Sequence, residues 1–483
     1  MEFFLGAAIV FVVDRAIRIA ALIVIPRDRK PTAAMAWLLA IFLIPIVGVI
    51  LYLLIGSYKL PKARLEKQKF IDGVIAERLA GTETGADAGA GPAWLPGIER
   101  MNRALTAMPA VGGNTATLIE DYQASIDAMA ADIDTATTFV HVEFYIVSFD
   151  EVTRGFFGAL ERAVKRGVTV RVLLDHVASV RAANSKATFA ELDRIGAKWS
   201  FMLPFQPLKG NFQRPDLRNH RKLVVVDGRV GYMGSQNLIS RDYNSQKNIK
   251  RGLMWQELVT RVTGPAVTAI NTIFLGDWFC ETDERIDSEN VAFADVPRTG
   301  DLDMQLVPSG PGYDYENNLR LFLGLLHSAQ KQVIITSPYF VPDESMLYAI
   351  TSARQRGLEV QLFVSEIGDQ GGVFHAQRSY YSELLRAGVR IFMYPGPYIL
   401  HAKHVSIDDD VAVIGSSNMD IRSFNLDLEI SLMVRGKTFV DDMRTVEQHY
   451  RDAGRELTLE EWSKEPKGGQ FLDGIARLTS AVQ

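Results

Sequence analysis

Residues 219–237 read "NHRKLVVVDGRVGYMGSQN", and residues 400–418 repeat the pattern as "LHAKHVSIDDDVAVIGSSN". Histidine, lysine, aspartate, glycine, serine and asparagine recur at identical spacings in the two stretches. A motif that returns once in a chain of 483 residues predicts a duplicated unit. The motif positions are His220, Lys222, Asp227, Gly234, Ser235 and Asn237 in the first copy, and His401, Lys403, Asp408, Gly415, Ser416 and Asn418 in the second.

The duplication continues on both sides of the motif. "TTFVHVEFYIVSFD" in the first half and "KQVIITSPYFVPD" in the second are apolar strand patterns, and each is followed by a helical pattern and another strand. Gly167 and Gly357 occupy the same position at the end of that helix, where glycine suits a left-handed cap. Alternating strands and helices predict an α/β fold with mixed sheets flanked by helices. Two copies of one unit should pack about a pseudo-twofold axis.

Within each copy the motif predicts a β-hairpin with its polar groups on one side. Asp-Gly at 227–228 lies between two apolar runs and indicates the turn. Residues i and i+2 of a strand face the same way, so His220 and Lys222 share a side, as do Ser235 and Asn237. Two copies together bring two imidazoles and two ammonium groups to one place. This set suits a phosphodiester, because lysines and polar donors stabilise phosphoryl oxygens while histidines handle attack and departure.

The remaining polar residues divide into site candidates and structural ones. Asp227 and Asp408 complete the catalytic motif, although the turn position of Asp227 favours a structural role. Glu257 and Glu429 follow the two motifs and are predicted to orient the histidines, since a general base needs a third group that fixes its tautomer. Ser235, Asn237, Ser416 and Asn418 are predicted to bind the substrate phosphate. No metal site and no cofactor is expected, and six histidines are interpreted as structural: His141, His176, His327, His375, His404 and His449.

The N-terminus predicts a membrane hairpin. Residues 3–25 and 32–55 are apolar and each is long enough to cross about 30 Å of hydrocarbon as a helix. The second stretch carries no charge, whereas the first contains Asp14, Arg15 and Arg18, of which Asp14 and Arg18 can pair one turn apart. A first helix lying partly in the membrane interface is the alternative. Basic residues at 59–69 outnumber those at 27–30 and favour a cytoplasmic body.

Composition and linkers set the domain boundaries. We expect a membrane hairpin at 1–58, a juxtamembrane segment and linker at 59–110, one repeat at 111–295 and a second at 296–483. The net charge of −5 does not favour nucleic-acid binding. Cys280 is the only cysteine, which excludes an intrachain disulfide, and its aromatic surroundings indicate an inert buried thiol.

The doubled H-x-K-x4-D-x6-G-S-x-N pattern resembles the phospholipase D superfamily at every motif position of both copies. The segments "SPYFVPD", "VPSGPG" and "RSFNLDLEI", with the second apolar stretch, are similar to bacterial cardiolipin synthases. The similarity extends over nearly the whole chain. The charged first apolar stretch departs from this pattern and leaves the topology open.

This resemblance implies a phosphatidyltransferase without a metal that works in two steps. One histidine, by analogy His220, attacks phosphatidylglycerol to form a phosphatidyl-histidine, and His401 serves as acid and base while cardiolipin forms. The implied partners are phosphatidylglycerol, cardiolipin and the bilayer, and the implied location is the bacterial inner membrane with several spans. A phospholipase D or another transferase with water or a small alcohol as acceptor uses the same residues. A superfamily nuclease and a scaffold with a relic site are less favoured, and the sequence leaves the oligomeric state open.

One insertion distinguishes the first copy. The stretch "FQPLKGNFQRPDLRN", residues 205–219, lies before the first histidine and has no counterpart of similar length in the second copy. It interleaves aromatic and basic residues, which suits a membrane interface, although an ordinary surface loop is an equal alternative. The residues concerned are Phe205, Leu208, Phe212, Lys209, Arg214 and Arg218.

Overall fold

Two copies of one α/β unit build the body of the protein, as the sequence predicts. The computed structural model describes residues 2–27, 29, 31–56, 59–79, 91–206, 214–286 and 296–478. The first repeat consists of β1 (Val111–Ile119), α6 (Tyr122–Asp134), β2 (Phe139–Phe144), α7 (Arg154–Lys165), β3 (Thr169–Asp175), α8 (His176–Arg181), α9 (Ser185–Ile195), β4 (Lys198–Met202), β5 (Leu223–Val226), β6 (Val230–Gly234), α10 (Gln246–Lys250), β7 (Met254–Gln256), β8 (Val259–Thr263) and α11 (Ala266–Thr282).

The second repeat follows the same order with a few additions at its end. It consists of β9 (Leu302–Ser309), α13 (Asn317–Ser328), β10 (Gln332–Thr336), β11 (Phe340–Val341), α14 (Glu344–Gln355), β12 (Glu359–Ser365), α15 (Gly371–Arg378), α16 (Tyr381–Ala387), β13 (Arg390–Tyr394), β14 (Tyr398–Leu400), β15 (His404–Ile407), β16 (Val411–Gly415), β17 (Met419–Asp420), α17 (Ile421–Asn425), β18 (Glu429–Arg435), α18 (Lys437–Ala453), β19 (Arg455–Leu457), α19 (Leu459–Ser463) and α20 (Lys467–Leu478).

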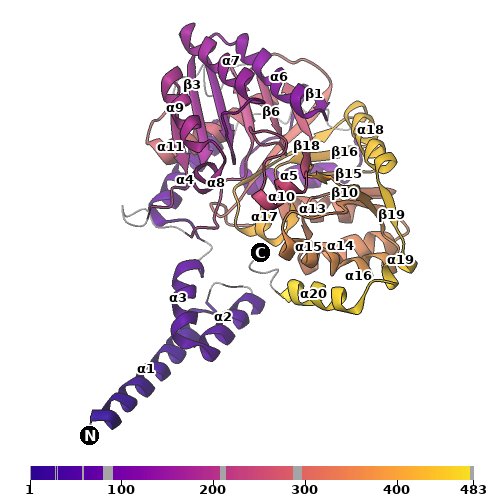
Figure 1. Ribbon diagram of the computed structural model, residues 1–483. Coiled ribbons are helices and arrows are strands. Elements are labelled where there is room, and N and C mark those ends of the chain that lie inside the picture. The colour runs from indigo at the N-terminus through magenta and orange to yellow at the C-terminus, as the bar shows by residue number, and fades with distance from the viewer. Residues whose placement is uncertain are drawn as a thin grey trace.

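The main sheet is continuous across both repeats, and its strand order is nearly symmetric about the middle. Its 15 strands run β19-β13-β12-β10-β15-β16-β18-β9-β1-β8-β6-β5-β2-β3-β4, so β9 and β1 meet in the middle as antiparallel neighbours. Moving outward from this seam, each strand of one repeat has its counterpart at the same place in the other. The expected pseudo-twofold arrangement is therefore confirmed, and its axis passes between β1 and β9 (Figure 1).

Apolar side chains on both faces of the sheet hold the layers together. One core runs through both repeats and joins the sheet to α11 and α18, with Phe274 and Phe439 among its members. On the other face the repeats have separate cores, one beneath α6 and α7 and the other beneath α13 and α14. Because strands covered on both faces bury all their side chains, β2, β5, β15 and β16 are buried throughout.

Three helices precede the body where two were expected: α1 (Glu2–Val24), α2 (Pro31–Leu43) and α3 (Pro45–Ile55). The continuous helix predicted for residues 32–55 is broken at Ile44, because Pro45 has no N–H and starts α3 at its first position. Among the described residues, every helix falls short of the length and apolar character needed for a membrane crossing. The predicted pairing of Arg18 with Asp14 is confirmed at 2.9 Å.

The segment predicted as a juxtamembrane linker contains two packed helices, α4 (Lys62–Leu79) and α5 (Leu95–Thr106). Helix α4 lies on α11, where Arg64 pairs with Glu281. Helix α5 packs on α13 and β9 of the second repeat. The Ala/Gly-rich stretch at 80–90 lies outside the described residues. Part of the segment at 59–110 therefore belongs to the folded body, and the sequence missed it because α4 has a largely polar composition.

Candidate active site

The two motif histidines lie at the junction of the repeats. His220 and His401 come shortly before β5 and β15, at the ends of these strands that face away from the hairpin turns. Each histidine is tied to the other repeat by its own backbone: the N–H of His220 donates to the carbonyl of Leu428, and that of His401 to the carbonyl of Gln256. In addition, β14 pairs with β7 in parallel. The histidines are thus held by contacts between repeats.

The glutamates predicted to orient the histidines do so in a crossed arrangement. Nδ1 of His220, in the first repeat, lies 3.0 Å from a carboxylate oxygen of Glu429 in the second. Nδ1 of His401, in the second repeat, lies 2.8 Å from a carboxylate oxygen of Glu257 in the first. An ionised carboxylate only accepts, so Nδ1 of His401 carries the proton beside Glu257 and Nε2 is left free, and the same holds for His220 when Glu429 is ionised. Neither repeat contains a complete histidine–glutamate pair of its own.

The motif serines hold these glutamates. The hydroxyl of Ser235 donates to Glu257 at 2.5 Å and accepts from the N–H of Leu258, and Ser416 makes the same bonds with Glu429 and Ile430. A hydroxyl has one proton, and both serines give it to a carboxylate. This geometry does not fit the expected role of Ser235 and Ser416 as phosphate donors. In the structure their hydroxyls contact the glutamates, and phosphate binding by these serines stays a prediction.

The motif glycines allow this close contact. A Cβ on Gly234 would collide with the carbonyl of Leu258, and one on Gly415 with the carbonyl of Ile430. Each glycine precedes the serine that bonds to the neighbouring strand. The Gly-Ser pair therefore brings two strands near enough for the serine to reach the glutamate.

Both motif lysines are buried beside the histidines, as their spacing predicts. Nζ of Lys222 donates to the carbonyl of His220 at 2.6 Å, and Nζ of Lys403 to the carbonyl of His401 at 2.5 Å. An ammonium group has three protons, so each lysine keeps donors for a second partner. Burial lowers the pKa of Lys222 to about 8 and that of Lys403 to about 7, although Glu257 and Glu429 oppose the change.

The motif asparagines differ from each other. In the first copy Asn237 donates to the hydroxyl of Tyr243 at 2.7 Å and accepts from the N–H of Ile146. In the second, Oδ1 of Asn418 is buried without a hydrogen-bond partner among the described residues. Asn418 thus has a side-chain atom to offer a ligand, whereas the amide of Asn237 is already engaged. Phosphate binding by these two residues stays a prediction.

The motif aspartates lie away from the histidines, in positions that suit a structural role, and their place in the catalytic set stays a prediction. Asp227 and Asp408 follow the last residues of β5 and β15, at the opposite ends from His220 and His401. Both have φ of 50°, the left-handed conformation that suits a hairpin turn. Asp227 accepts from the N–H groups of residues 137–139, and Asp408 from those of residues 330–332. Each aspartate fixes the hairpin to the start of the neighbouring strand.

This placement predicts that Asp227→Asn affects stability more than chemistry. An amide offers one acceptor oxygen in place of two, so the bonds from Thr137 are lost while those from Thr138 and Phe139 can remain. For a half-buried group we expect a loss of about 1–2 kcal/mol in the free energy of unfolding, measured by thermal unfolding in detergent. The activity per folded molecule should stay within about twofold of the wild type, and a selective loss of turnover would return Asp227 to the catalytic set.

Several aromatic residues that the sequence did not single out surround the histidines. The ring of Tyr145 meets that of His220 edge to face at 5.3 Å, and Trp255 does the same to His401 at 4.8 Å. Tyr339 lies 6.3 Å from His401, and Tyr243 stacks on Trp255. A tyrosine follows the strand beside the motif hairpin in each repeat, after β2 and β10, and comparison of the two halves could have found this signal.

Arg221, between His220 and Lys222 of the first motif, faces the opposite way and was also missed by the sequence analysis. Its Nε donates to the backbone carbonyl of Glu429 at 3.1 Å, and its guanidinium is paired with Asp277 of α11. Asp277 in turn lies 3.8 Å from Arg64 of α4. Buried charged contacts thus connect Arg64 of α4, through Asp277 and Arg221, with the backbone of the glutamate beside His220.

The insertion before the first histidine is only partly described. Arg218 is buried and pairs with Asp175, and Arg214 pairs with Asp216 at 2.5 Å. These two arginines are therefore used within the protein, which weakens the predicted role of the loop as a basic lipid contact. Leu208, Lys209 and Phe212 lie outside the described residues.

The two crossed pairs have unequal electrostatics. Burial and the nearby Lys222 and Lys403 hold the pKa of His220 well below its ordinary value, and that of His401 is lowered to about 3 by burial despite Glu257. Burial raises the pKa of Glu429 to about 7. For Glu257 the effect of burial is outweighed by His401, Lys403 and Ser235, which lower its pKa to about 2. At neutral pH Glu257 is an anion, whereas Glu429 is near half protonation.

The remaining predictions about isolated residues agree with the structure. Cys280 is buried, and burial raises the pKa of its thiol to about 12, so it is no nucleophile. His141 is stacked between Phe139 and Phe274 and bonds to Asn271, as expected of a structural histidine. His404 is buried in β15 and turned toward Glu447.

Comparison with known proteins gives a consistent result. Residues 129–263 and 322–450 match the family described as "Cardiolipin synthase, PLD-like domain", and residues 16–57 match "Phospholipase_D-nuclease N-terminal". Cardiolipin synthase A of Pectobacterium carotovorum is 31% identical over 94% of this chain and 93% of its own. The cardiolipin synthase of Halalkalibacterium halodurans is 33% identical over 85% and 81%. The crystal structure of a phosphatidylserine synthase from Haemophilus influenzae shares the fold, with a TM-score of 0.59 and 15% identity over 80% of this chain and 99% of its own.

Proposed function

This chain belongs to the cardiolipin synthase family of phospholipase D-like phosphatidyltransferases, and we propose that it joins two phosphatidylglycerol molecules into cardiolipin and glycerol. The observation that carries the proposal is the crossed pairing of His220 with Glu429 and of His401 with Glu257. Each repeat supplies the histidine that the other repeat orients. The two histidines therefore serve one site and act on one phosphodiester.

In the first step, Nε2 of His220 attacks the phosphorus of one phosphatidylglycerol, and the bond from phosphorus to the headgroup glycerol oxygen breaks. The departing oxygen takes a proton from Nε2 of His401, so a phosphatidyl-His220 intermediate and free glycerol result. We assign the roles this way because anionic Glu257 favours a proton on His401, whereas Glu429 is close to half protonation and leaves His220 neutral.

In the second step, a glycerol hydroxyl of another phosphatidylglycerol gives its proton to His401 and attacks the same phosphorus. The bond between phosphorus and Nε2 of His220 breaks, and cardiolipin leaves. Both histidines return to their starting protonation states. The number of phosphodiester bonds is unchanged, so the reaction needs no external energy source.

Lys222 and Lys403 hold the phosphoryl oxygens in this scheme. Their charges lower the pKa of both histidines in the free protein. A bound phosphodiester anion offsets these charges, which raises the pKa of His401 and helps it carry the proton that the leaving glycerol needs. Substrate binding and protonation of the acid are thus coupled.

The test is the identity of the lipid product. Purified full-length protein is incubated with phosphatidylglycerol that carries a label in its headgroup glycerol, in mixed micelles. We expect cardiolipin and labelled free glycerol in equal amounts, and no product with the His220→Ala/His401→Ala double variant. Phosphatidic acid as the main product would mean that water is the acceptor and that the protein acts as a phospholipase D.

A membrane location accompanies this function. Helices α1 to α3 expose many large apolar side chains, among them Phe11, Leu39, Leu43, Ile46 and Leu53. We place these helices in the bacterial inner membrane as a multi-pass anchor, with the body on the cytoplasmic side where the basic residues after the second apolar stretch are favoured. The lipid substrate then reaches the site from the same membrane.

Glu257→Gln and Glu429→Gln should each lower kcat and change the pH profile. The carbonyl oxygen of glutamine can still accept from Nδ1, so the orientation is kept, but the charge is lost. A charged acceptor strengthens a hydrogen bond by about 1–2 kcal/mol, which corresponds to about 5-fold to 30-fold in rate. With Glu257→Gln the pKa of His401 falls further, so this histidine loses the proton that the leaving glycerol needs at a lower pH, and the alkaline side of the kcat profile should move to lower pH.

Glu447→Gln provides the matched control for these variants. Glu447 is a buried carboxylate next to His404, outside the site. Its replacement should lower stability without moving the pH profile. Equal profiles for Glu257→Gln and Glu447→Gln would remove the glutamates from the mechanism.

A further inference from the structure

The C-terminal helix α20 presents an apolar face that none of the described residues covers. Phe471, Leu472, Ile475 and Leu478 are exposed, with 68% of Phe471 and 84% of Leu478 accessible to solvent. Their spacing places them on one side of the helix. Single exposed apolar residues are normal on a soluble surface, but four on one helix form a patch that requires an explanation.

The opposite side of α20 is fixed to the second repeat. Asp473 is buried; it accepts from Nδ1 of His375 at 2.7 Å and lies 3.4 Å from Arg378, and both of these residues belong to α15. Arg378 also covers the ring of Trp462. The helix is therefore held rigidly, with its apolar side turned outward.

The exposed charges on α20 itself are basic. Asp473 is the only acidic residue of α20, and it faces inward, whereas Lys467 and Arg477 are exposed. Arg477 lies 3.7 Å from Glu383 at the edge of the patch. An apolar face bordered by lysine and arginine matches a surface of anionic lipid, in which rings and aliphatic chains enter the headgroup region and cations meet phosphates.

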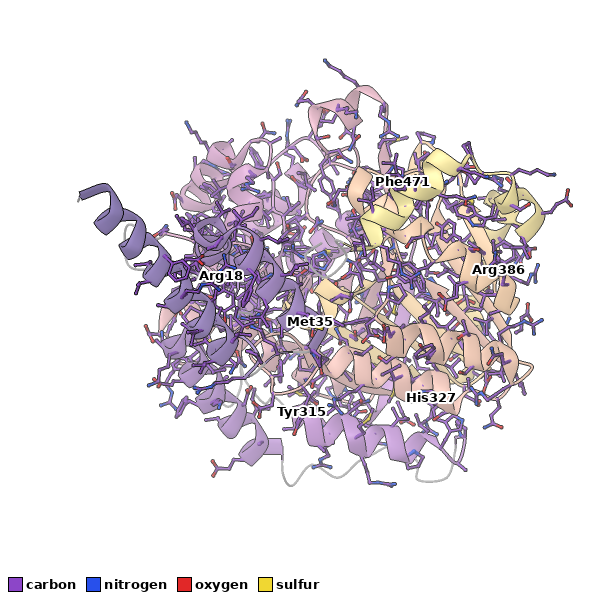
Figure 2. All side chains as sticks on the ribbon, turned by 90° about the horizontal axis from the view of Figure 1, so that it is seen from below. Arg18, Met35, Tyr315, His327, Arg386 and Phe471 are labelled. Atoms are coloured by element: carbon purple, nitrogen blue, oxygen red, sulfur yellow. The ribbon has the colours of Figure 1, made fainter. Side chains whose placement is uncertain are left out.

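The patch lies on the same side of the body as the N-terminal helices. In Figure 1, α20 and α2 both occupy the lower side of the molecule. Figure 2, seen from below, shows Phe471 of α20 and Met35 of α2 on the face turned to the viewer, and Met35 is itself 69% exposed. One flat apolar surface can therefore touch both helices at once.

Helix α20 is also connected, through α15, to residues beside His401. It packs on α15, which begins directly after Asp369 and Gln370. Asp369 accepts from the hydroxyl of Tyr339, whose ring lies near His401, and its carbonyl accepts from Asn248 of the other repeat. A continuous set of contacts therefore runs from α20 through α15 and Asp369 to Tyr339 beside His401.

We propose that α20 is an interfacial helix that lies in the headgroup region of an anionic bilayer and holds the mouth of the active site at the lipid surface, an inference that rests on the proposed function. This membrane contact is distinct from that of the N-terminal helices, because α20 anchors the second repeat. Without it, the body is attached to the membrane at one side only and the second repeat can tilt away.

A depth measurement tests the contact without relying on catalysis. A fluorophore is attached to Leu472→Cys in the full-length protein, where buried Cys280 reacts slowly, and the protein is reconstituted into vesicles of phosphatidylglycerol and phosphatidylcholine. Nitroxide-labelled lipids should quench this fluorophore at least about three times more than one on Asp442→Cys, an exposed position on α18 at the opposite side of the body. Equal quenching at the two positions would overturn the proposal. If shielding of the fluorophore at position 472 increases with protein concentration and not with lipid concentration, the patch would instead contact a second copy of the chain.

An activity ratio tests the consequence. Phe471→Ser/Ile475→Ser removes two large apolar side chains, and because interfacial binding scales with buried apolar area we expect about a tenfold loss of turnover on vesicles. Turnover of a short-chain, dispersed phosphatidylglycerol should stay within twofold. Leu459→Ser, which removes a half-exposed leucine from α19, is the matched control and should leave both unchanged. Equal losses on both substrates would mean that α20 only supports the fold. A wild type inactive on both substrates would refute the proposed function and leave the quenching result to decide on the helix.

Discussion

His220→Ala and His401→Ala are each expected to abolish turnover while the protein remains folded. The crossed glutamates join both histidines into one site, so removal of either leaves no second site to continue. Loss of the nucleophile or of the acid and base should each cost about 10⁴-fold in kcat. The measurement is conversion of phosphatidylglycerol to cardiolipin, with thermal unfolding as the check on folding. A variant with half the wild-type rate would show that the repeats work independently.

A substrate with a good leaving group separates the roles of the two histidines. A phosphatidyl ester of p-nitrophenol needs no acid for its departure, because the phenolate leaves unprotonated at neutral pH. His401→Ala should therefore still release a burst of nitrophenol and become labelled on His220, whereas His220→Ala should do neither. The reverse outcome would exchange the nucleophile and the acid between the repeats.

Lys222→Ala and Lys403→Ala are expected to lower kcat by about 10²–10³-fold, the range for removal of one preorganised donor from a transition state. Both ammonium groups are buried and each already bonds to the carbonyl of its own histidine. Alanine therefore removes a charge that no water can replace. Lys331→Ala, an exposed lysine paired with Asp409, is the control and should have wild-type activity. Near-normal rates for both site variants would make these lysines structural.

The pH dependence of the wild type gives a second test of the lysines. Only the cationic form binds phosphate, and the pKa values of about 8 for Lys222 and about 7 for Lys403 mean that this form is lost as the pH rises through that range. kcat/KM, which reports the free protein, should fall on the alkaline side above pH 7. kcat should fall less, because a bound phosphodiester raises both pKa values. A flat kcat/KM up to pH 9 would contradict the assignment.

The duplicated fold could be predicted because its information is local. The strand patterns, the Asp-Gly turn and the spacing of His220 and Lys222 depend only on neighbouring residues, and the structure contains the hairpin and the repeat that they indicate. The sequence also identified Glu257 and Glu429 as partners of histidines. It could not tell which glutamate serves which histidine, because that depends on how the repeats meet at β1 and β9.

The differences between prediction and structure have physical causes as well. Asp227 and Asp408 were placed in the catalytic set by their motif, a role that stays a prediction, whereas in the structure both fix the backbone of the hairpin. Ser235 has the chemistry of a phosphate donor, and only the structure shows that its single proton goes to Glu257. The apolar run at 32–55 predicted one helix because hydrophobicity outweighed Pro45, whose missing N–H breaks it.

The crossed pairs also decide when a newly made chain becomes active. The partners are separated by 209 residues for His220 and Glu429 and by 144 for Glu257 and His401, so each pair closes a very long loop. During synthesis the first half emerges with one histidine and one glutamate that do not belong together. On the proposed mechanism, a ribosome-bound or truncated chain lacks both complete pairs and is therefore expected to be inactive. Dividing each pair between the two halves makes completion of the polypeptide a condition for catalysis.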